Sequence, residues 1–421
     1  MKVLLINPNR YKSPPVPPLG LEYISGSLEE KGHSVEIVDL CFSENLYKDL
    51  GDAIESFGPD VAGVTVRNVD TVLYHTNEFF LDEIRDIITY IKTDHGLLVI
   101  AGGTGVSANP GGILKYLGAD FVVSGAAETT ICEILDSIKR HDKGGGVFYG
   151  RLSGDIACPR RTDKIDYRRY RDAGGILGFQ THKGCSSSCV YCLEANSRVS
   201  FRNIPDVVGE IKGFVDSGFD HFHLCDSEFN ESLEYSTDFC QALKKVGMGI
   251  RWAVYMKPSN FNRELFRLLK DAGVYLITLS VDSWKKCEQY WSDFEKFVFG
   301  AKAYGIGIAV DFLTGFPYEK REEILQYLDT LGRPLPDSVG INTYIRLYES
   351  LQVTKIIKSD PKLKDHLSGC TDDDTLLKPV FYNHIDDDTL KELINGDPLF
   401  RIEGPEKGVN YTRIETVKSE G

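Results

Sequence analysis

The chain has no long hydrophobic run, no excess of positive charge and no evident disulfide framework. No apolar stretch in its 421 residues approaches the ~20 residues that a membrane span needs. The apolar start, "MKVLLINPNR", runs into Asn-Pro without a small-residue cleavage site, which indicates a first strand and not a signal peptide. A formal charge of -14 disfavours nucleic acid as a partner. We therefore expect a protein that binds neither membranes nor nucleic acid.

Ten cysteines are present, and most of them stand singly in periodic apolar segments, as reduced core thiols do. This distribution predicts a reducing cytoplasm as the location of the protein. The exception is "CSSSCVYC", in which Cys185, Cys189 and Cys192 stand within eight residues. The chemistry of this cluster depends on the fold in which it lies.

The first 140 residues alternate strand and helix patterns. Short apolar runs recur there, and stretches with helical amphipathic spacing separate them. Continuous apolar strands are typical of a parallel sheet that is covered on both faces. The expected strands are residues 2–8, 34–40, 60–66, 97–103 and 120–125. These units predict an α/β, flavodoxin-like doubly wound domain over residues 1–140, with its ligand at the carboxyl ends of the strands.

The rest of the chain divides into three parts. Residues 141–175 are Gly-rich and basic without periodicity, which predicts a linker. Alternation resumes over residues 176–350 and predicts a partial (β/α)6 barrel, open on one side. Its expected strands are residues 176–182, 221–226, 250–256, 275–282, 306–316 and 338–348. The polar residues 351–421 predict a short α-rich extension that closes the substrate cleft. Within it "DDDTL" occurs twice, at 372–376 and 386–390, as acidic residues that cap helix starts do.

Three kinds of site are compatible with Cys185, Cys189 and Cys192. Structural zinc needs a fourth ligand, for which His182 is near in sequence. A redox dithiol would use Cys189 and Cys192 and leave Cys185 without a role. An iron-sulfur cubane held by three thiolates keeps one iron open for a reactive ligand. The position of the cysteines after the first barrel strand, where barrel active sites form, favours the cluster.

The stretch "CSSSCVYC" resembles the C-x3-C-x2-C signature of radical S-adenosylmethionine enzymes, with Tyr191 as the aromatic residue before the last cysteine. The resemblance implies a [4Fe-4S] cluster on Cys185, Cys189 and Cys192, whose open iron binds S-adenosylmethionine. "LCDSEFN", "WAVYMK", "LSVDS" and "FLTGFP" resemble the cofactor-holding elements of that family. Their candidate S-adenosylmethionine contacts are Asp226, Ser227, Glu228, Lys257, Ser280, Asp282 and Gly315. Lys257 stands where related enzymes often carry an arginine, and each of these side chains taken singly is as commonly a plain strand or cap residue.

The N-terminal pattern resembles the cobalamin-binding domain of cobalamin-dependent radical S-adenosylmethionine enzymes. The matching stretches, in order, are "VLLINP", "PPLGLEYISGSLEEKGHSVEIVDL", "PDVAGVTV", "VIAGGTGVSANP" and "ADFVVSGAAE". The implied cobalamin contacts are Leu19, Arg67, Asn68, Asp70, Tyr74, Gly102, Gly103, Thr104, Gly125 and Glu128. No D-x-H-x-x-G motif is present, so the "RNVD" stretch is expected beneath cobalt, and His75 is a weaker candidate ligand. The family's Gly-Glu-x-Glu turn reads Gly-Ala-Ala-Glu here and loses one carboxylate.

The resemblance, which covers about residues 1–350, implies a C-methyltransferase that methylates an unactivated sp3 carbon. Cobalamin would carry the methyl group as methylcobalamin, and a 5'-deoxyadenosyl radical would remove hydrogen from the substrate carbon, under anaerobic conditions. The compact length and the "RNVD" pattern are similar to the archaeal glutamine C-methyltransferases that modify methyl-coenzyme M reductase, which implies a peptide or protein substrate. A ferredoxin- or flavodoxin-type electron donor is expected. Two alternatives are a cyclase or ring-rearranging enzyme without net methyl transfer, and a non-catalytic corrinoid-binding sensor.

Overall fold

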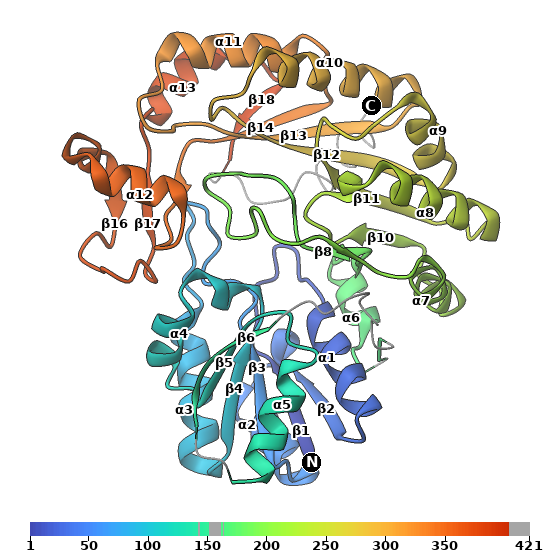
Figure 1. Ribbon diagram of the computed structural model, residues 1–421, viewed down its shortest axis with the longest axis vertical. Helices are drawn as coiled ribbons and strands as arrows, with labels where there is room; N and C mark the ends of the chain where they lie inside the picture. The colour runs from blue at the N-terminus through green and yellow to red at the C-terminus, as the bar shows by residue number, and fades with distance from the viewer. Residues whose placement is uncertain (142–143, 151–160, 163, 404–421) are drawn as a thin grey trace.

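The computed structural model describes residues 1–141, 144–150, 161–162 and 164–403. It has two parallel sheets, one in each of two domains, and helices pack against both (Figure 1). The α/β fold class predicted from the sequence is confirmed. The N-terminal domain lies in the lower half of Figure 1, and the barrel domain lies above it.

The N-terminal sheet has six parallel strands in the order β2-β1-β3-β4-β5-β6. Its strands are β1 (Lys2–Asn7), β2 (Ser34–Asp39), β3 (Val61–Thr65), β4 (Leu98–Gly102), β5 (Phe121–Gly125) and β6 (Gly146–Gly150). Its helices are α1 (Leu19–Glu30), α2 (Leu46–Phe57), α3 (Leu81–His95), α4 (Pro110–Leu117) and α5 (Thr130–Lys139). The central strand β1 is covered on both faces, and its side chains from Val3 to Ile6 are at most 1% exposed.

Strand β6 lies inside the segment that the sequence predicted to be a linker. Its residues pair in parallel with β5, from Phe121 with Gly146 to Gly125 with Gly150. It is an edge strand between glycines, so its apolar run is too short to stand out in the sequence. The linker prediction is therefore wrong for residues 146–150.

The barrel sheet has seven parallel strands in the order β18-β14-β13-β12-β11-β10-β7. They are β7 (Leu177–Phe179), β10 (His221–Leu224), β11 (Arg251–Met256), β12 (Val274–Asp282), β13 (Gly307–Leu313), β14 (Ser338–Asn342) and β18 (Phe400–Ile402). The helices of this domain are α6 (Tyr167–Asp172), α7 (Ile204–Asp216), α8 (Leu233–Val246), α9 (Arg263–Asp271), α10 (Glu288–Ala303) and α11 (Arg321–Gly332). The sheet does not close, since β7 and β18 are its two edges.

The C-terminal extension differs from the α-rich prediction because it contributes strands as well as helices. Strands β16 (Leu367–Gly369) and β17 (Val380–Tyr382) both lie between helices α12 (Gln352–Ser359) and α13 (Asp387–Ile394) in the chain. Strand β17 pairs with β15 (Ile345–Arg346) and with β16 in a small antiparallel sheet. Strand β18 joins β14 as the seventh barrel strand, so the expected six-stranded barrel gains one strand from the extension.

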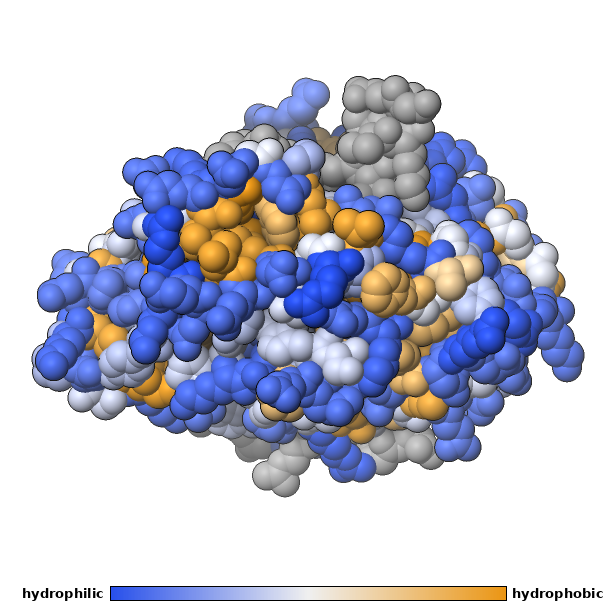
Figure 2. Space-filling view, turned by 90° about the horizontal axis from the view of Figure 1, so that it is seen from above, coloured by the Kyte–Doolittle hydropathy of each residue, from blue (hydrophilic) through white to orange (hydrophobic). Residues whose placement is uncertain are grey.

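The surface above the barrel is largely hydrophilic, with a few apolar patches (Figure 2). Exposed large apolar side chains in this part of the chain include Phe299, Leu325 and Leu335. Among the described residues, no helix combines the length and the apolar character needed to cross a membrane.

Candidate functional site

A cleft of about 990 Å³ lies between the two domains. Its walls are the loops that follow β1 and β3, the inner face of the barrel sheet and the segment after β14. The structure brings six of the predicted site residues to this cleft. They are Leu19, Arg67 and Asn68 from the N-terminal domain and Tyr191, Asp226 and Ser280 from the barrel domain.

The three clustered cysteines lie on the loop between β8 (His182–Lys183) and β9 (Ser200–Phe201). Hydrogen bonds within the loop fix its course. The Cys185 amide donates to the Ser197 hydroxyl at 2.8 Å, and the Ser197 amide donates back to the Cys185 carbonyl at 3.0 Å. Farther along, the Asn196 amide donates to the Ser187 carbonyl at 2.8 Å. These hydrogen bonds join the two ends of the cysteine loop at the carboxyl end of β7. They therefore fix the positions of the three cysteines.

Burial governs the chemistry of these thiols. It raises the pKa of Cys189 to about 11, with the Asp282 carboxylate as a second cause. Burial also raises the pKa of Cys185 and of Cys192. All three are therefore neutral thiols until a metal displaces the protons. Beside them, Tyr191 packs on Phe316, with 5.8 Å between the ring centroids.

The donor set fits an iron-sulfur cluster better than a single ion. The His182 side chain is fully buried, and its Nδ1 lies 3.0 Å from an Asp226 carboxylate oxygen. Within the described part of the chain, no three His, Cys, Asp or Glu side chains are gathered tightly enough to hold one metal ion. The three cysteine sulfurs are therefore not arranged to bind the same single ion. In an iron-sulfur cluster each thiolate binds a different iron, so this arrangement fits a cluster. Cys185, Cys189 and Cys192 would hold it.

The acidic motif after β10 supports the cysteine loop. The Asp226 carboxylate accepts hydrogen bonds from the Thr181 amide at 2.8 Å and from the His182 amide at 3.3 Å. The Ser227 hydroxyl donates to Glu194, which follows the last cysteine. Glu228 is buried, and burial raises its pKa to about 8, so this carboxyl keeps its proton at neutral pH. The roles of these three residues as S-adenosylmethionine contacts stay predictions.

The next candidates pair with neighbouring residues around the same loop. Lys257 Nζ lies 2.9 Å from Glu231 and 3.2 Å from the Ser186 hydroxyl between the cysteines. Asp282 lies 2.9 Å from Lys286, and the Cys189 sulfur lies 3.9 Å from the Asp282 carboxylate.

Gly315 occupies a turn that excludes any larger residue. Its φ is +84°, and a β-carbon there would overlap the Thr343 carbonyl. The Gly315 amide donates to Glu319 at 2.6 Å. The predicted Gly-x-Pro turn is thus present, although Gly315 itself is not among the described residues that line the cleft.

The "RNVD" stretch follows β3 and forms part of the cleft wall. Arg67 and Asn68 line the cleft, whereas Asp70 is 1% exposed and accepts a hydrogen bond from Arg346 Nε at 2.7 Å. The Tyr74 ring stacks on Tyr344, with centroids 3.9 Å apart and an interplanar angle of 7°. Arg346 and Tyr344 both belong to the segment after β14. This stretch therefore ties the N-terminal domain to the barrel domain.

His75, the weaker candidate for a cobalt ligand, is engaged elsewhere. Its Nε2 lies 2.8 Å from an Asp387 carboxylate oxygen at the start of α13. A histidine that coordinates cobalt through Nε2 would have to leave this carboxylate.

The remaining cobalamin candidates shape the turns behind the cleft wall. Gly103 has a φ of +108°, and a β-carbon there would lie 2.6 Å from the Val66 carbonyl. The Gly102 carbonyl accepts the Val66 amide at 2.6 Å, and the Thr104 hydroxyl donates to the Arg67 carbonyl at 2.6 Å. The turn from Gly102 to Thr104 thereby holds the backbone on which Arg67 and Asn68 stand.

Gly125 is the last residue of β5, and Glu128 lies just after this strand. The φ of Gly125 is +90°, and a β-carbon there would lie 2.9 Å from the Gly150 carbonyl of β6. The Glu128 carboxylate accepts from Lys183, next to the cysteine loop. Its partner is thus in the barrel domain, a contact that the sequence motif did not indicate.

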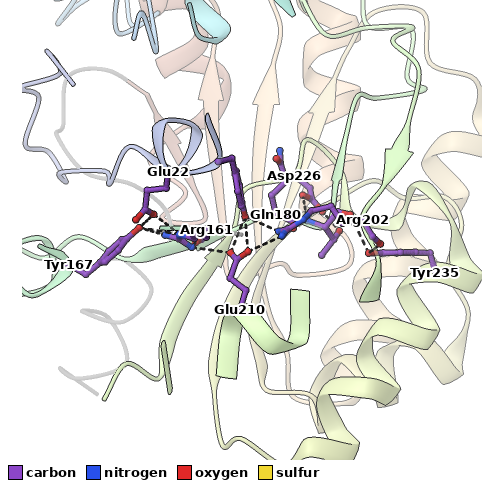
Figure 3. Close-up of polar contacts among 11 residues, drawn as sticks. Glu22, Arg161, Tyr167, Gln180, Arg202, Glu210, Asp226 and Tyr235 are labelled. Atoms are coloured by element: carbon purple, nitrogen blue, oxygen red, sulfur yellow. Dashed lines mark hydrogen bonds and ion pairs between the residues drawn. The ribbon is translucent and has the colours of Figure 1, made fainter. Parts of the chain in front are cut away.

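A buried polar network near α1 also escaped the sequence analysis (Figure 3). Arg161 lies between Glu22 and Tyr167 on one side and Glu210 on the other, with Nε 2.5 Å from Glu22 and Nη1 3.1 Å from Glu210. Glu210 also pairs with Arg202, at 2.9 Å. The Arg202 guanidinium donates to the Gln180 carbonyl at 2.8 Å, just before the strand that opens the cysteine loop. The network therefore links α1 to the base of that loop.

Comparisons with known proteins agree with this architecture. Residues 13–135 match the family model described as "B12 binding domain", and residues 179–331 match the radical SAM superfamily. The tryptophan 2-C-methyltransferase of Streptomyces laurentii is 24% identical, over 84% of this chain and 74% of the relative.

Two solved structures share the fold across nearly the whole chain. The first is the radical S-adenosylmethionine methyltransferase TsrM of Kitasatospora setae, solved with cobalamin and a [4Fe-4S] cluster bound. It superposes with a TM-score of 0.83 at 24% identity, and the match covers 95% of this chain and 92% of that one. The second, the cobalamin-dependent enzyme OxsB, gives a TM-score of 0.74 at 15% identity, over 94% and 66%. The family predicted from the sequence is confirmed: the chain is a cobalamin-dependent radical S-adenosylmethionine enzyme of the methyltransferase type.

Proposed function

We propose that this enzyme transfers a methyl group from cobalamin to an unactivated sp3 carbon of a peptide or protein residue, with a glutamine of methyl-coenzyme M reductase as the favoured substrate. The observation that carries the proposal is the cleft that both domains line. Leu19, Arg67 and Asn68 stand on its N-terminal wall, and Tyr191 stands on its barrel wall beside the cysteine loop. A carbon in this cleft can be reached from both cofactor sites.

The chain's own residues would bind and orient the reactants. Once both cofactors are bound, the cluster and S-adenosylmethionine would provide the chemistry that removes hydrogen from an unactivated carbon, and cobalamin would provide the methyl group. Cys185, Cys189 and Cys192 would hold the cluster. The Asp226 carboxylate would stabilise the start of their loop, because it accepts hydrogen bonds from the backbone amides just before the cysteines. Arg67 would lie against cobalamin, on a backbone held by the Thr104 hydroxyl.

The cellular setting follows from this chemistry. We place the enzyme in the anaerobic cytoplasm, with a one-electron donor of ferredoxin or flavodoxin type. Methyl transfer is favoured over cyclisation, because the named relative and TsrM are methyltransferases.

The test is anaerobic reconstitution with iron, sulfide and cobalamin, followed by incubation with S-adenosylmethionine that carries a deuterated methyl group and with glutamine-containing peptides. We expect the labelled methyl on a carbon of the peptide and 5'-deoxyadenosine in the same sample, both read by mass spectrometry. A modified product without added methyl would contradict methyl transfer. Absence of 5'-deoxyadenosine from the reduced, loaded protein would contradict radical catalysis and favour a corrinoid-binding sensor.

A cysteine variant tests the cluster directly. Cys192→Ala should lose the iron-sulfur absorption and all 5'-deoxyadenosine formation, because each thiolate holds one iron. The matched control is Cys287→Ser, which changes an exposed thiol before α10 and should keep both. Retention of iron and of turnover by Cys192→Ala would show that the cluster is not bound there.

A further inference from the structure

A carboxylate from the loop after β10 holds the residue that follows the first cysteine. The Glu231 carboxylate accepts a hydrogen bond from the Ser186 amide at 3.1 Å and a second one from the Ser186 hydroxyl at 2.5 Å. Ser186 is exposed, whereas the Glu231 side chain is only 2% exposed. Both donors belong to one residue, so the carboxylate fixes the backbone and the side chain of Ser186 together. The position of Cys185, directly before Ser186, is fixed with them.

A lysine from the loop after β11 balances the charge of this carboxylate. Lys257 Nζ lies 2.9 Å from Glu231 and 3.2 Å from the Ser186 hydroxyl, and the Lys257 side chain is 14% exposed. The other carboxyl group that acts on Lys257 is that of Glu228, which keeps its proton at neutral pH because burial raises its pKa to about 8. Glu231 is therefore the charged partner of this lysine.

Two asparagines bind the two loops to each other. The Asn230 side chain is fully buried, accepts a hydrogen bond from the Lys257 amide at 3.0 Å and donates to the Lys257 carbonyl at 2.8 Å. The Asn260 side chain donates to the Asn230 and Glu231 carbonyls, at 3.1 and 3.0 Å. Its φ of +48° lies in the left-handed region, which asparagine adopts more readily than most residues. Glu231 and Lys257 thus contact Ser186 as one unit.

The contacts of Lys257 differ from those of a residue that binds S-adenosylmethionine. The resemblance implies such a contact, at a position where related enzymes often carry an arginine. A lysine lacks the planar fork that binds a carboxylate through two parallel hydrogen bonds. Its ammonium group already donates to Glu231 and Ser186, and neither Lys257 nor Glu231 is among the described residues that line the cleft.

We propose that Glu231 and Lys257 are positioning residues of the iron-sulfur cluster: Glu231 holds the Cys185–Ser186 peptide, and Lys257 neutralises Glu231. This inference rests on the cluster assigned in the proposed function. Burial is the main cause that raises the pKa of the Cys185 thiol, and the Glu231 carboxylate adds to it, so this carboxylate acts on the sulfur. Without Lys257, a buried, unpaired carboxylate would repel the thiolates that hold the cluster.

The first test measures how fast the loaded protein loses iron. The full-length chain, loaded with cluster and cobalamin, is mixed anaerobically with an excess of a ferrous-iron chelator, and the coloured complex is followed over time. We expect Lys257→Met to lose iron about tenfold faster than the wild type, and Lys257→Arg, which keeps the charge, to resemble the wild type. Adding Glu231→Gln to Lys257→Met should slow the loss again, because the unpaired charge is gone and the glutamine oxygen still accepts the Ser186 amide.

A second measurement separates the two roles of Lys257. Equilibrium dialysis with labelled S-adenosylmethionine, scaled to the iron content of each sample, gives the Kd at the clusters that remain. We expect the Kd of Lys257→Met to stay within about twofold of the wild-type value, the margin within which independent sites add. A weaker affinity together with a wild-type rate of iron loss would assign Lys257 to S-adenosylmethionine and overturn the inference.

The matched control is Lys244→Met, which removes a lysine of α8 that pairs with Asp271 at 2.8 Å and leaves Asp271 its pair with Arg267. It should lose iron at the wild-type rate. Circular dichroism checks that each variant folds, and Lys257→Gln, which also lacks the charge, replaces Lys257→Met if that variant does not.

Two further results would contradict the inference. One is a rate of iron loss in the uncharged Lys257 variant no faster than in Lys244→Met, and the other is a faster loss that Glu231→Gln does not relieve. If the wild type takes up the cluster and forms 5'-deoxyadenosine, either result refutes this inference alone. If the wild type does neither, the proposed function fails with it.

Discussion

Two of the sets of contacts that join the domains differ in burial and in what they hold. The first, here called the α1 seam, consists of Glu22, Arg161, Glu210 and Arg202, whose side chains are at most 8% exposed. The second, the loop seam, joins residues 67–80 to the segment after β14. It consists of the Asp70–Arg346 ion pair, the Tyr74–Tyr344 stack and the His75–Asp387 contact. The α1 seam links helices α1 and α7 through Arg161, whereas the loop seam holds a loop that lines the cleft.

The difference in burial predicts that the two seams have different roles, one rigid and one adjustable. Charges buried as densely as those of the α1 seam cannot separate without leaving a carboxylate or a guanidinium unpaired. In the loop seam only the Asp70–Arg346 pair is fully buried, and Tyr74 is 36% exposed. We therefore expect the α1 seam to keep the domains in register and the loop seam to adjust when a substrate occupies the cleft.

The strongest expected effect is that of Arg161→Met. This substitution removes the Arg161 cation from two buried carboxylates, of which Glu210 keeps Arg202 and Glu22 does not, and we expect the free energy of unfolding to fall by about 3–5 kcal/mol. Urea unfolding followed by circular dichroism measures it. Hydrogen exchange should rise in α1 and α7 together, because both helices lose the same partner.

Two further variants sharpen this result. Arg171→Met removes an arginine of α6 that is 52% exposed, and it should change the free energy by less than about 1 kcal/mol. Adding Glu22→Gln to Arg161→Met should recover part of the loss, since it removes one uncompensated charge. A loss no larger in Arg161→Met than in Arg171→Met would mean that the α1 seam does not hold the domains together.

An intermediate effect is expected for Asp70→Asn in the loop seam. In this variant Arg346 keeps its hydrogen bonds to the Leu376 and Leu377 carbonyls, at 3.1 and 2.7 Å. The buried guanidinium therefore still has hydrogen-bond acceptors. We expect a loss of about 1.5–3 kcal/mol, the size of a hydrogen bond to a charged group. Hydrogen exchange should rise in residues 67–80 and stay unchanged in α1, and a rise in both regions would contradict the division between the seams.

The sequence predicted what depends on local pattern. The continuous apolar runs identified the strands β1 to β5, β7 and β10 to β14 of the two parallel sheets, and the spacing of Cys185, Cys189 and Cys192 indicated the cluster loop. Of the two "DDDTL" repeats, the second begins a helix, where Asp386 accepts the Thr389 amide at 2.7 Å. The first repeat does not begin a helix. Its Asp373 carboxylate accepts a hydrogen bond from the Lys378 amide and so closes a turn.

The parts that the sequence did not predict depend on contacts across long separations. Glu22 and Arg161 are 139 residues apart, and Asp70 and Arg346 are 276 residues apart. An arginine in a Gly-rich basic segment is usually at the surface, so nothing local marked Arg161 as buried. Strand β18 has only three residues, and its place beside β14 depends on the whole barrel.

The smallest expected effect is that of His75→Gln, and it sharpens the comparison by testing what His75 binds. The side chains of His75 and Asp387 are 28% and 19% exposed, and contacts of this kind contribute less than about 1 kcal/mol. Glutamine can still donate to Asp387, so we expect little change in stability and none in cobalamin content. If His75 instead coordinated cobalt, the wild-type Co(II) electron paramagnetic resonance spectrum would show nitrogen hyperfine splitting that His75→Gln abolishes. Because Nε2 is held by Asp387, we expect the two spectra to be the same, which would leave His75 a residue of the loop seam alone.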